Sequence, residues 1–416
     1  MIEKQALAAR KIEIEGLLAE YTSKNLKLGM TRGVPCGEQL DLSDGLLHAL
    51  DSADCRIGAA DYRNYGILDG IPEAKEYFAP VPGVSPKEIM VLGNASLNIM
   101  YDSIVRAMLY GVVGSEKPWS KYEKIKFLCP VPGYDRHFSI CQSLGIEMIN
   151  VPMTSSGPDM DIVEELAAGD DSIKGIWCTP KYSNPQGYTY SDDTVRRFAG
   201  MKTAASDFRI LWDNAYAVHH LGDEQDELLN IMDECRAAGN ENRVFIYAST
   251  SKITFPGAGI SFFAASQENL AQIRGIMGMQ TIGHDKINQL RHVNFMAAGG
   301  GVEEHMKKHA EILRPKFGIV DRILTERLGN LGIAKWTKPR GGYFVSLNVP
   351  EGCAKRTIEL AAGAGVALTP AGSTYPYMSD PRDENIRIAP TFPSCADLEA
   401  AMEILCLCVE LAWLEK

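Results

Sequence analysis

A lysine and an aspartate follow two apolar runs of this sequence, and together they could perform imine chemistry. The run 244–248 leads through three hydroxyl residues into Lys252, and the run ending at Trp212 continues into Asp213. A lysine amine can form an imine (Schiff base) with an aldehyde. A carboxylate beside a pyridine nitrogen keeps that nitrogen protonated, which makes the ring an electron sink. Taken alone, Lys252 could equally be a solvated lysine and Asp213 a helix N-cap.

Three more polar residues stand at or near the ends of apolar runs. Tyr216 follows Asp213 by three positions and either donates to a ring hydroxylate or only packs. Asn184 lies in an Asn-Pro turn, where its amide either reaches a ring oxygen or only shapes the turn. Arg387 is a lone arginine between two isoleucines, a setting in which a guanidinium usually has a carboxylate partner, structural or from a substrate.

The elements that would position these residues begin near residue 89. Short β-branched or apolar runs alternate there with longer helical patterns, as in a mostly parallel sheet with helices on both faces. Ligands of such sheets gather at the carboxyl ends of the strands. The predicted strands are 89–92, 125–129, 147–151, 173–178, 210–212, 244–248 and 260–264, and the predicted helices are 96–110, 135–144, 159–168, 192–204 and 267–278.

The two ends of the chain have a different pattern, which predicts a smaller α+β domain. Residues 1–21 form a candidate amphipathic helix. After residue 300 come a long helix to Leu328, a strand at 342–347, a helix near 354–364, a strand at 386–388 and a final helix from Ala396. We therefore predict a large domain over 45–298 and a small domain built from 1–44 and 299–416.

Composition excludes several other classes of protein. The formal net charge of -11 argues against a nucleic-acid partner. The first ten residues hold no signal-peptide core, and no later run is long and apolar enough to span a bilayer, which predicts a cytoplasmic protein without a membrane partner. The ten scattered cysteines are expected to be reduced, buried thiols. His305 and His309 have no third ligand in sight, so we expect a solvated helix face there and no metal site.

An ordered set of motifs resembles the class I, fold-type I aminotransferases, which use pyridoxal 5'-phosphate (PLP). The motifs are NYGILDGIPE at 64–73, SNPQG at 183–187, DNAY at 213–216, STSK at 249–252 and IRIAPTF at 386–392. Three further segments, TRGVP at 31–35, EQLDLS at 38–43 and KITFPGAGIS at 252–261, look closest to a divergent aspartate aminotransferase-like branch. The resemblance spans residues 30–392. It implies an α/β fold with a mostly parallel seven-stranded sheet in a large PLP-binding domain, plus a smaller α+β domain.

The resemblance implies a role around the cofactor ring for each matching residue. Lys252 would hold PLP as a Schiff base and, once released by substrate, would move the proton of the substrate Cα. Asp213 would pair with the ring nitrogen, and Asn184 and Tyr216 would bind the ring oxygen. Tyr134, in VPGYDRH, occupies the position where relatives stack an aromatic side chain on the ring.

The resemblance also implies substrate contacts. Arg387 would hold the α-carboxylate of the amino acid with two parallel hydrogen bonds. Gly33 matches a residue whose backbone contacts substrate, and Arg32 in the same loop is either the cation for a distal carboxylate or a plain surface arginine. His219 and His220 follow the Asp213 strand and could line the site in a minor role.

The cofactor phosphate needs hydrogen-bond donors and a cation, and the resemblance does not identify the cation. A helix N-terminus after Gly93 offers free N–H groups, and the predicted contacts are Ala95, Ser96, Leu97, Ser249 and Ser251. Tyr65 resembles a tyrosine that reaches the phosphate from a neighbouring subunit, which implies a homodimer. Relatives place an arginine where this chain has Gly259. Our candidates for the replacement cation are Lys286, Arg291 and Lys181.

These patterns predict an aminotransferase that moves an amino group from an L-amino acid to a 2-oxo acid by a ping-pong mechanism. Aspartate with 2-oxoglutarate is the preferred pair. Transamination of alanine or aromatic substrates, or β-elimination, stays open. The alternative from another class is a regulator that uses this fold to sense an amino acid or PLP. We expect an enzyme instead, because the stretch before the first motif is too short for a DNA-binding domain and because the chain is acidic.

Overall fold

The strands predicted in the middle of the chain form one large sheet. The computed structural model describes residues 2–416. In spatial order the strands are β4 (Ile89–Leu92), β11 (Ser261–Ala264), β10 (Val244–Ser249), β9 (Arg209–Asp213), β8 (Ile173–Cys178), β5 (Lys126–Val131), β6 (Glu147–Thr154) and β7 (Gly157–Pro158). Strands from β10 to β6 run parallel to their neighbours, whereas β11 is antiparallel to both β10 and β4. Every predicted strand is present, and the sheet gains the unpredicted two-residue β7.

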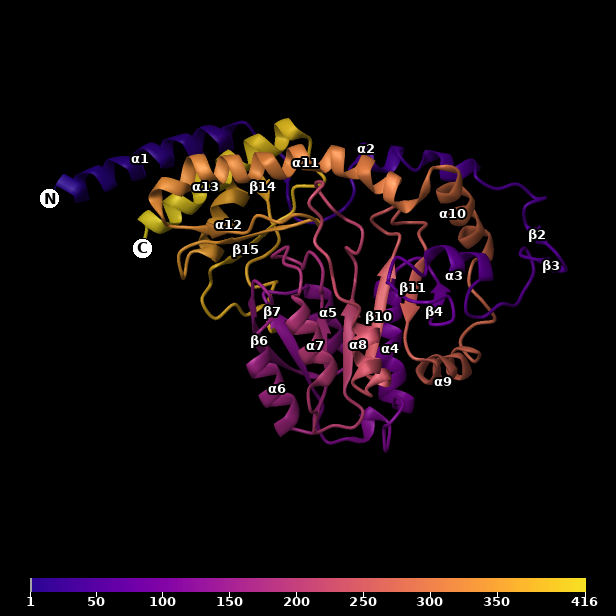
Figure 1. The fold of residues 1–416 in the computed structure, drawn as a ribbon. Helices are drawn as coiled ribbons and strands as arrows, with labels where there is room; N and C mark the ends of the chain where they lie inside the picture. Colours follow the sequence, from indigo (N-terminus) through magenta and orange to yellow (C-terminus); the bar gives the residue numbers. More distant parts are fainter. Residues whose placement is uncertain (1) are drawn as a thin grey trace.

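Helices cover both faces of this sheet (Figure 1). They are α3 (Pro72–Phe78), α4 (Ser96–Tyr110), α5 (Asp135–Ser143), α6 (Met160–Gly169), α7 (Asp192–Gly200), α8 (Ile231–Ala237), α9 (Gln267–Met277) and α10 (Lys286–Ala298). Alternate strand residues enter opposite cores: Phe127 and Leu211 belong to one apolar cluster, and Leu128 and Ile210 to the other. The strands β4, β8 and β9 are buried throughout for this reason.

Both chain ends build the second layer of structure. It holds α1 (Ile2–Ser23), α11 (Gly301–Leu328), α12 (Ala354–Gly363), α13 (Cys395–Leu414) and a sheet of β12 (Lys335–Trp336), β13 (Val345–Asn348) and β15 (Asn385–Ile388). β1 (Leu28–Gly29) pairs in parallel with β14 (Val366–Ala367). Ile14 and Leu18 share an apolar core with the C-terminal helix, and α1 lies along α13 (Figure 1). The exact domain limits stay a prediction.

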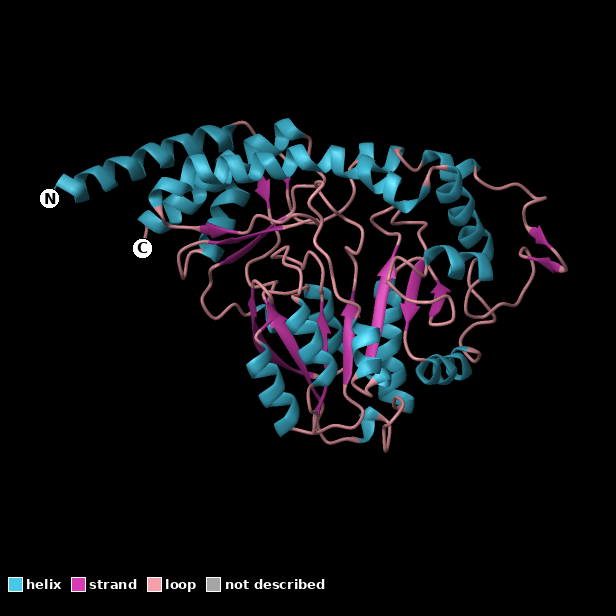
Figure 2. Ribbon diagram, viewed as in Figure 1, coloured by secondary structure: helices cyan, strands magenta, loops and turns pink. Residues whose placement is uncertain are grey.

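Short elements connect the large sheet with the second layer, and Figure 2 shows that much of the chain between them is loop. α2 (Gly37–Asp41) leads into a 3-10 turn at Asp44–His48, and β2 (Arg56–Ile57) pairs with β3 (Ala60–Asp61) as a small hairpin. Within residues 2–416, no helix combines the length and apolar character needed to cross a bilayer. All ten cysteines are free thiols, and of these only Cys395 is exposed.

Candidate active site

The carboxyl ends of β8, β9 and β10 lie side by side because these strands are parallel neighbours. A cavity of about 510 Å³ opens at this edge, against β15 and the segment around Gly33. Residues from distant parts of the sequence meet in it. Of the predicted site residues, those that line the cavity are Arg32, Gly33, Ser96, Leu97, Tyr134, Asn184, Asp213, Tyr216, Lys252 and Arg387.

Lys252 presents its amine to this cavity from the turn that follows β10. Burial lowers the pKa of the amine, and the Asp213 carboxylate opposes that shift only in part. Nζ lies 5.1 Å from the centroid of the Tyr216 ring. Within the described chain the amine makes no hydrogen bond, so it is available for bonding to a carbonyl carbon.

Asp213 has one paired and one unpaired carboxylate oxygen. Its Oδ2 accepts a hydrogen bond from Nε2 of His137 at 3.0 Å. Its Oδ1 is buried without a partner among the described residues. A buried, unpaired carboxylate oxygen is costly, so this atom calls for a donor from a ligand. A protonated ring nitrogen is such a donor, and the site therefore fits the PLP that the sequence implied.

His137 is a site residue that the motif analysis missed. It lies on α5, three positions after Tyr134, and its ring stacks on Trp177 with centroids 4.4 Å apart and planes 7° apart. The stack fixes the ring so that its N–H points at Asp213. The sequence signal was the histidine that ends the quoted VPGYDRH segment.

Two tyrosines and an amide surround the place of the ring. Burial raises the pKa of Tyr216 well above its usual value and also raises that of Tyr134. Both hydroxyls therefore stay protonated near neutral pH and can donate hydrogen bonds. Tyr216 packs against Tyr343 with ring centroids 5.9 Å apart. The Asn184 Oδ1 accepts from Arg387 Nη1 at 3.4 Å, so its amide is oriented by the same guanidinium that faces the substrate space.

Arg387 lies on β15 and is almost fully buried. Its Nη1 donates to the Asp135 carboxylate at 2.9 Å and its Nη2 to the Thr369 hydroxyl at 3.3 Å. The Nε is buried without a partner among the described residues. Its guanidinium carbon lies 4.9 Å from the centroid of the Phe344 ring. The carboxylate partner expected from the sequence is thus present within the chain as Asp135.

The expected phosphate donors are only partly brought together. Ser96 and Leu97 begin α4 and line the cavity, and Ala95 is the N-cap residue directly before them. Ala95, Ser249 and Ser251 do not line it, and the Ser249 hydroxyl donates to that of Ser251 at 3.0 Å. Contacts of these three with the cofactor stay a prediction.

Gly259 stands where the resemblance led us to expect an arginine. A Cβ at this position would lie 3.0 Å from Thr250 Oγ1 and 3.2 Å from the carbonyl oxygen of Asn94, so a side chain here would crowd both groups. His284, which the sequence did not single out, has a buried Nε2 without a partner among the described residues, and its Nδ1 lies 3.6 Å from where a Cβ of Gly93 would be.

None of the three candidate phosphate cations lines the cavity. Lys286 donates to the carbonyl oxygen of Gly66 at 3.0 Å, and Arg291 donates to Asn288 Oδ1 at 2.6 Å. Lys181 lines a different cavity, beside Trp212 and Asn214. Their placement gives the replacement-cation hypothesis no support.

The expectation for the paired histidines on α11 was wrong. His305 and His309 are buried, not solvated, because polar partners from other segments surround them. His305 donates to the carbonyl of Ile253 at 2.8 Å, and His309 accepts from Gln39 at 2.9 Å. Among residues 2–416, no cluster of three or more histidine, cysteine, aspartate or glutamate side chains could hold a metal ion.

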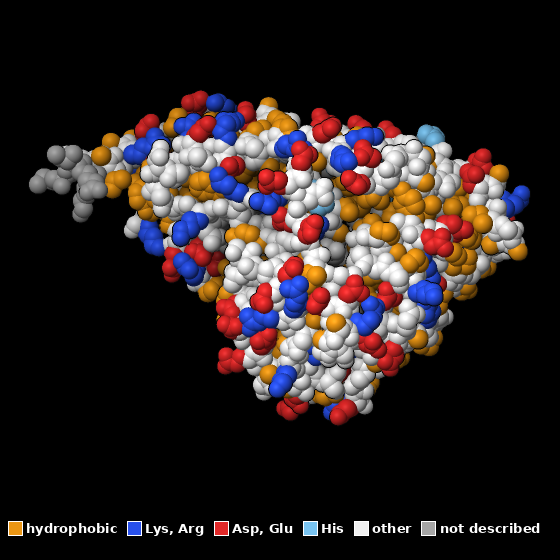
Figure 3. Space-filling model, viewed as in Figure 1, with side chains coloured by type: hydrophobic (Ala, Val, Ile, Leu, Met, Phe, Trp, Pro, Cys, Tyr) orange, Lys and Arg blue, Asp and Glu red, His pale blue; other side chains and the backbone are white. Residues whose placement is uncertain are grey.

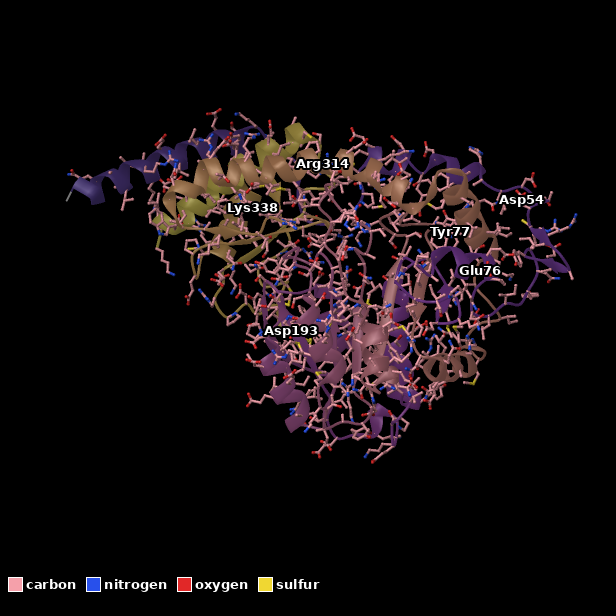
Figure 4. The ribbon with its side chains drawn as sticks, in the orientation of Figure 1. Asp54, Glu76, Tyr77, Asp193, Arg314 and Lys338 are labelled. Carbon is pink, nitrogen blue, oxygen red and sulfur yellow. The ribbon has the colours of Figure 1, made fainter. Side chains whose placement is uncertain are left out.

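His219 and His220, although adjacent in the sequence, line different parts of the molecule. His219 lies directly behind the lysine, with Nε2 3.3 Å from the carbonyl oxygen of Lys252. His220 instead bonds the Tyr182 hydroxyl at 2.7 Å and lines another cavity, of about 620 Å³, beneath α11. Tyr77 and Arg314 border that cavity (Figure 4), and Figure 3 shows hydrophobic side chains gathered there. It holds neither Lys252 nor Asp213.

The chain matches known proteins along its whole length. The family described as aspartate amino-transferase matches residues 2–416. An aspartate aminotransferase of Corynebacterium glutamicum is 48% identical over 401 residues, which are 96% of this chain and 93% of that protein. A crystal structure of an aspartate transaminase from that species has a TM-score of 0.96 at 47% identity and covers 99% of this chain and 97% of the other. The α-aminoadipate aminotransferase of Thermus thermophilus, complexed with N-(5'-phosphopyridoxyl)-L-leucine, shares the fold with a TM-score of 0.76 at 19% identity, and the match covers 96% of each chain.

Proposed function

Because this chain belongs to the aspartate aminotransferase family of fold-type I enzymes, we propose that it transfers the amino group of L-aspartate to 2-oxoglutarate by a ping-pong route. Membership of this family shows that the chain is an aminotransferase and that its cofactor is PLP. The observation that carries the proposal is the meeting of three groups in one cavity: the Lys252 amine, the unpaired Oδ1 of Asp213 and the Arg387 guanidinium.

Each residue of the cavity has a different role around the cofactor. When bound, PLP supplies an aldehyde for the donor's amino group and a ring that takes up electrons. Asp213 keeps a proton on the ring nitrogen, and His137 holds Asp213 in place. Tyr216 would donate from its protonated hydroxyl to the ring oxygen, with Asn184 as the second residue for that oxygen. Tyr134 would pack on the ring and exclude water from it.

Lys252 then moves the proton at the reacting carbon. Its lowered pKa leaves a larger fraction of the amine neutral at pH 7, which a base requires. Its Nζ has no competing hydrogen bond within residues 2–416, so it is free to swing between cofactor and substrate.

Two unpaired arginines favour an acidic substrate. Arg32 and Arg136 line the cavity, and the side chain of neither makes a hydrogen bond or ion pair with the described residues. Arg387 is neutralised in part by Asp135 and still has an unpaired Nε. A dicarboxylate would meet one cation at each end. Alanine or an aromatic amino acid would leave the second cation without a partner, so we rank these donors lower.

A panel of amino donors tests the proposal. Each L-amino acid is added to the PLP-loaded protein without an acceptor, and the shift of the cofactor absorbance to the amine form is followed. We expect aspartate and glutamate to convert the cofactor fastest, and 2-oxoglutarate to restore the starting spectrum. Faster conversion by alanine or phenylalanine would contradict the substrate assignment.

Replacing Arg387 with glutamine should raise KM for every amino donor. The lost hydrogen bonds to a charged carboxylate are worth roughly 1.5–3 kcal/mol, which is roughly tenfold to hundredfold in KM. Arg32→Gln is the matched control, because it should raise KM only for donors with a second carboxylate. Steady-state kinetics with aspartate and with alanine separate the two. Equal effects of both substitutions on both donors would contradict these roles.

The surface around Tyr65 supports the proposal of a homodimer. This side chain is 84% exposed and does not line the cavity of its own chain. Met279 and Ile282, 72% and 63% exposed, lie on a segment packed against the Tyr65 loop, since a Cβ built on Gly283 would lie 2.6 Å from the carbonyl oxygen of Gly66. Such exposed apolar residues favour coverage by another subunit. We propose that Tyr65 reaches the cofactor phosphate in the partner's site.

Hybrid dimers test this shared site. Tyr65→Phe should weaken PLP binding by roughly tenfold, because one hydrogen bond to a charged group is lost. When Tyr65→Phe chains and Lys252→Ala chains are co-expressed with two tags, the hybrid dimer contains one site with both residues intact. We expect that site to bind PLP with the wild-type Kd. A hybrid with the weak Kd of Tyr65→Phe would show that Tyr65 acts within its own chain.

A further inference from the structure

The backbone carbonyls of Lys252 and Ile253 lie in a buried turn that gives them no backbone partner. The amides of Ile253 and Thr254 both donate to the carbonyl of Thr250, but no backbone amide donates to the carbonyls of Lys252 and Ile253 in the described chain. Buried carbonyls need donors. Side chains supply them: His219 Nε2 at 3.3 Å and the Tyr343 hydroxyl at 3.5 Å for Lys252, and His305 Nε2 at 2.8 Å for Ile253.

Gln39 forms hydrogen bonds with two of the side chains around the lysine turn. Its amide nitrogen donates to His309 Nδ1 at 2.9 Å and to the Tyr343 hydroxyl at 3.0 Å. His309 in turn lies 3.2 Å from His305, nitrogen to nitrogen. A carbonyl only accepts, so the protons of Tyr343 and His305 all point toward the lysine turn.

The hydrogen bond from Gln39 requires a neutral His309, and burial favours the neutral form of all three histidines. Burial lowers the pKa of His309 to about 3, with a further contribution from His305. Burial also lowers the pKa of His305 and that of His219. A neutral His309 can accept on Nδ1 from Gln39, which a charged ring could not.

Gln39 is also tied to the segment that covers the substrate space. Its Oε1 accepts from the backbone amide of Cys36 at 3.2 Å. A few residues earlier, the carbonyl of Thr31 accepts from the Thr369 hydroxyl at 2.7 Å, and Thr369 accepts from Arg387 at 3.3 Å. The segment 31–36 is therefore linked through Thr369 to the carboxylate-binding arginine at one end, and through Gln39 and Tyr343 to the lysine turn at the other.

We propose that Gln39 and Tyr343 are positioning residues that hold the Lys252 turn in register with the substrate-contacting segment 31–36. The inference rests on the proposed function, because it assigns Lys252 the reacting amine. Buried hydrogen bonds of this kind hold the groups they join in one arrangement, although Nδ1 of His219 has no partner among the described residues. Neither side chain needs to touch substrate for this effect.

Two substitutions, Tyr343→Phe and Gln39→Leu, test the proposal in the PLP-loaded protein. Tyr343→Phe keeps the stack on Tyr216 and removes only the hydroxyl. Hydrogen–deuterium exchange followed by mass spectrometry should show roughly tenfold faster exchange over 250–256 in both variants, with β8 and β9 unchanged. Tyr182→Phe is the matched control, because that buried hydroxyl bonds His220 instead, and it should leave 250–256 unchanged.

Kinetics supply the second readout. A displaced lysine slows chemistry more than binding, so kcat should fall roughly tenfold to hundredfold in both variants while KM changes less than twofold. The double variant should behave like either single one, because both remove the same connection. Unchanged exchange over 250–256, or a loss confined to KM, would overturn the proposal. The exchange result does not depend on which donor is used, so failure of the aspartate assignment is distinguishable.

Discussion

Replacing Lys252 with alanine is expected to lower kcat by roughly 10⁴-fold and to remove the violet absorbance of the bound cofactor. The substitution deletes both the amine that bonds the aldehyde and the base that moves the Cα proton, and loss of a positioned base alone costs roughly 10²–10⁴-fold. Absorbance spectra and single-turnover kinetics with aspartate measure the two losses separately.

Lys252→Arg is the control that separates the amine from its charge. Arginine keeps a positive group beside Asp213 but stays protonated in proteins, so it can neither form the imine nor act as the base. We expect it to be as inactive as the alanine variant. Activity within tenfold of wild type in Lys252→Arg would mean that position 252 supplies only charge, which would contradict the assignment.

Asp213→Asn is the second large effect that we expect, with kcat lower by roughly 10²–10³-fold, as for loss of one electrostatic group aimed at the reacting system. An amide is nearly the same size but cannot keep the ring nitrogen protonated. Because Oδ1 of Asp213 is buried without a partner in the described residues, the cofactor-free variant should unfold at the same temperature as the wild type or higher.

His137→Phe is the matched control for this prediction. It keeps an aromatic ring stacked on Trp177 but removes the hydrogen bond to Asp213 Oδ2. The carboxylate itself remains, so we expect a smaller decrease in kcat than in Asp213→Asn. Rates are compared under saturating PLP and substrate. If Asp213→Asn kept more than a third of the wild-type kcat, the ring nitrogen would not depend on this carboxylate.

The large sheet could be predicted because its strands are short apolar runs separated by regular helical patterns. The helix α10 could not, because most of its buried residues are polar: Lys286, Asn288, Gln289 and His292 are buried there beside Leu290 and Met296. Those polar side chains bond to backbone groups of distant segments, among them the Ile71 amide and the Gly259 carbonyl. A pattern of hydrophobic residues does not contain such long-range partners.

The same limit explains what was missed in the site. Lys252, Asp213, Asn184 and Tyr216 follow strands in recognisable motifs, so their meeting at one sheet edge could be expected. The partner of Arg387 is Asp135, which lies 252 positions away, and nothing local to either residue indicates the pair. His305 and His309 were misjudged for the same reason, since Gln39 and the Ile253 carbonyl reach them only in the folded chain.

Reduction of the PLP-loaded protein with borohydride, followed by peptide mass mapping, tests the central claim most directly. Borohydride fixes the bond between the cofactor and its lysine, so the labelled residue is read from the peptide masses. We predict one phosphopyridoxyl group, on Lys252 in the peptide that follows β10. A label on another lysine, or a protein that stays colourless and unlabelled at saturating PLP, would contradict it.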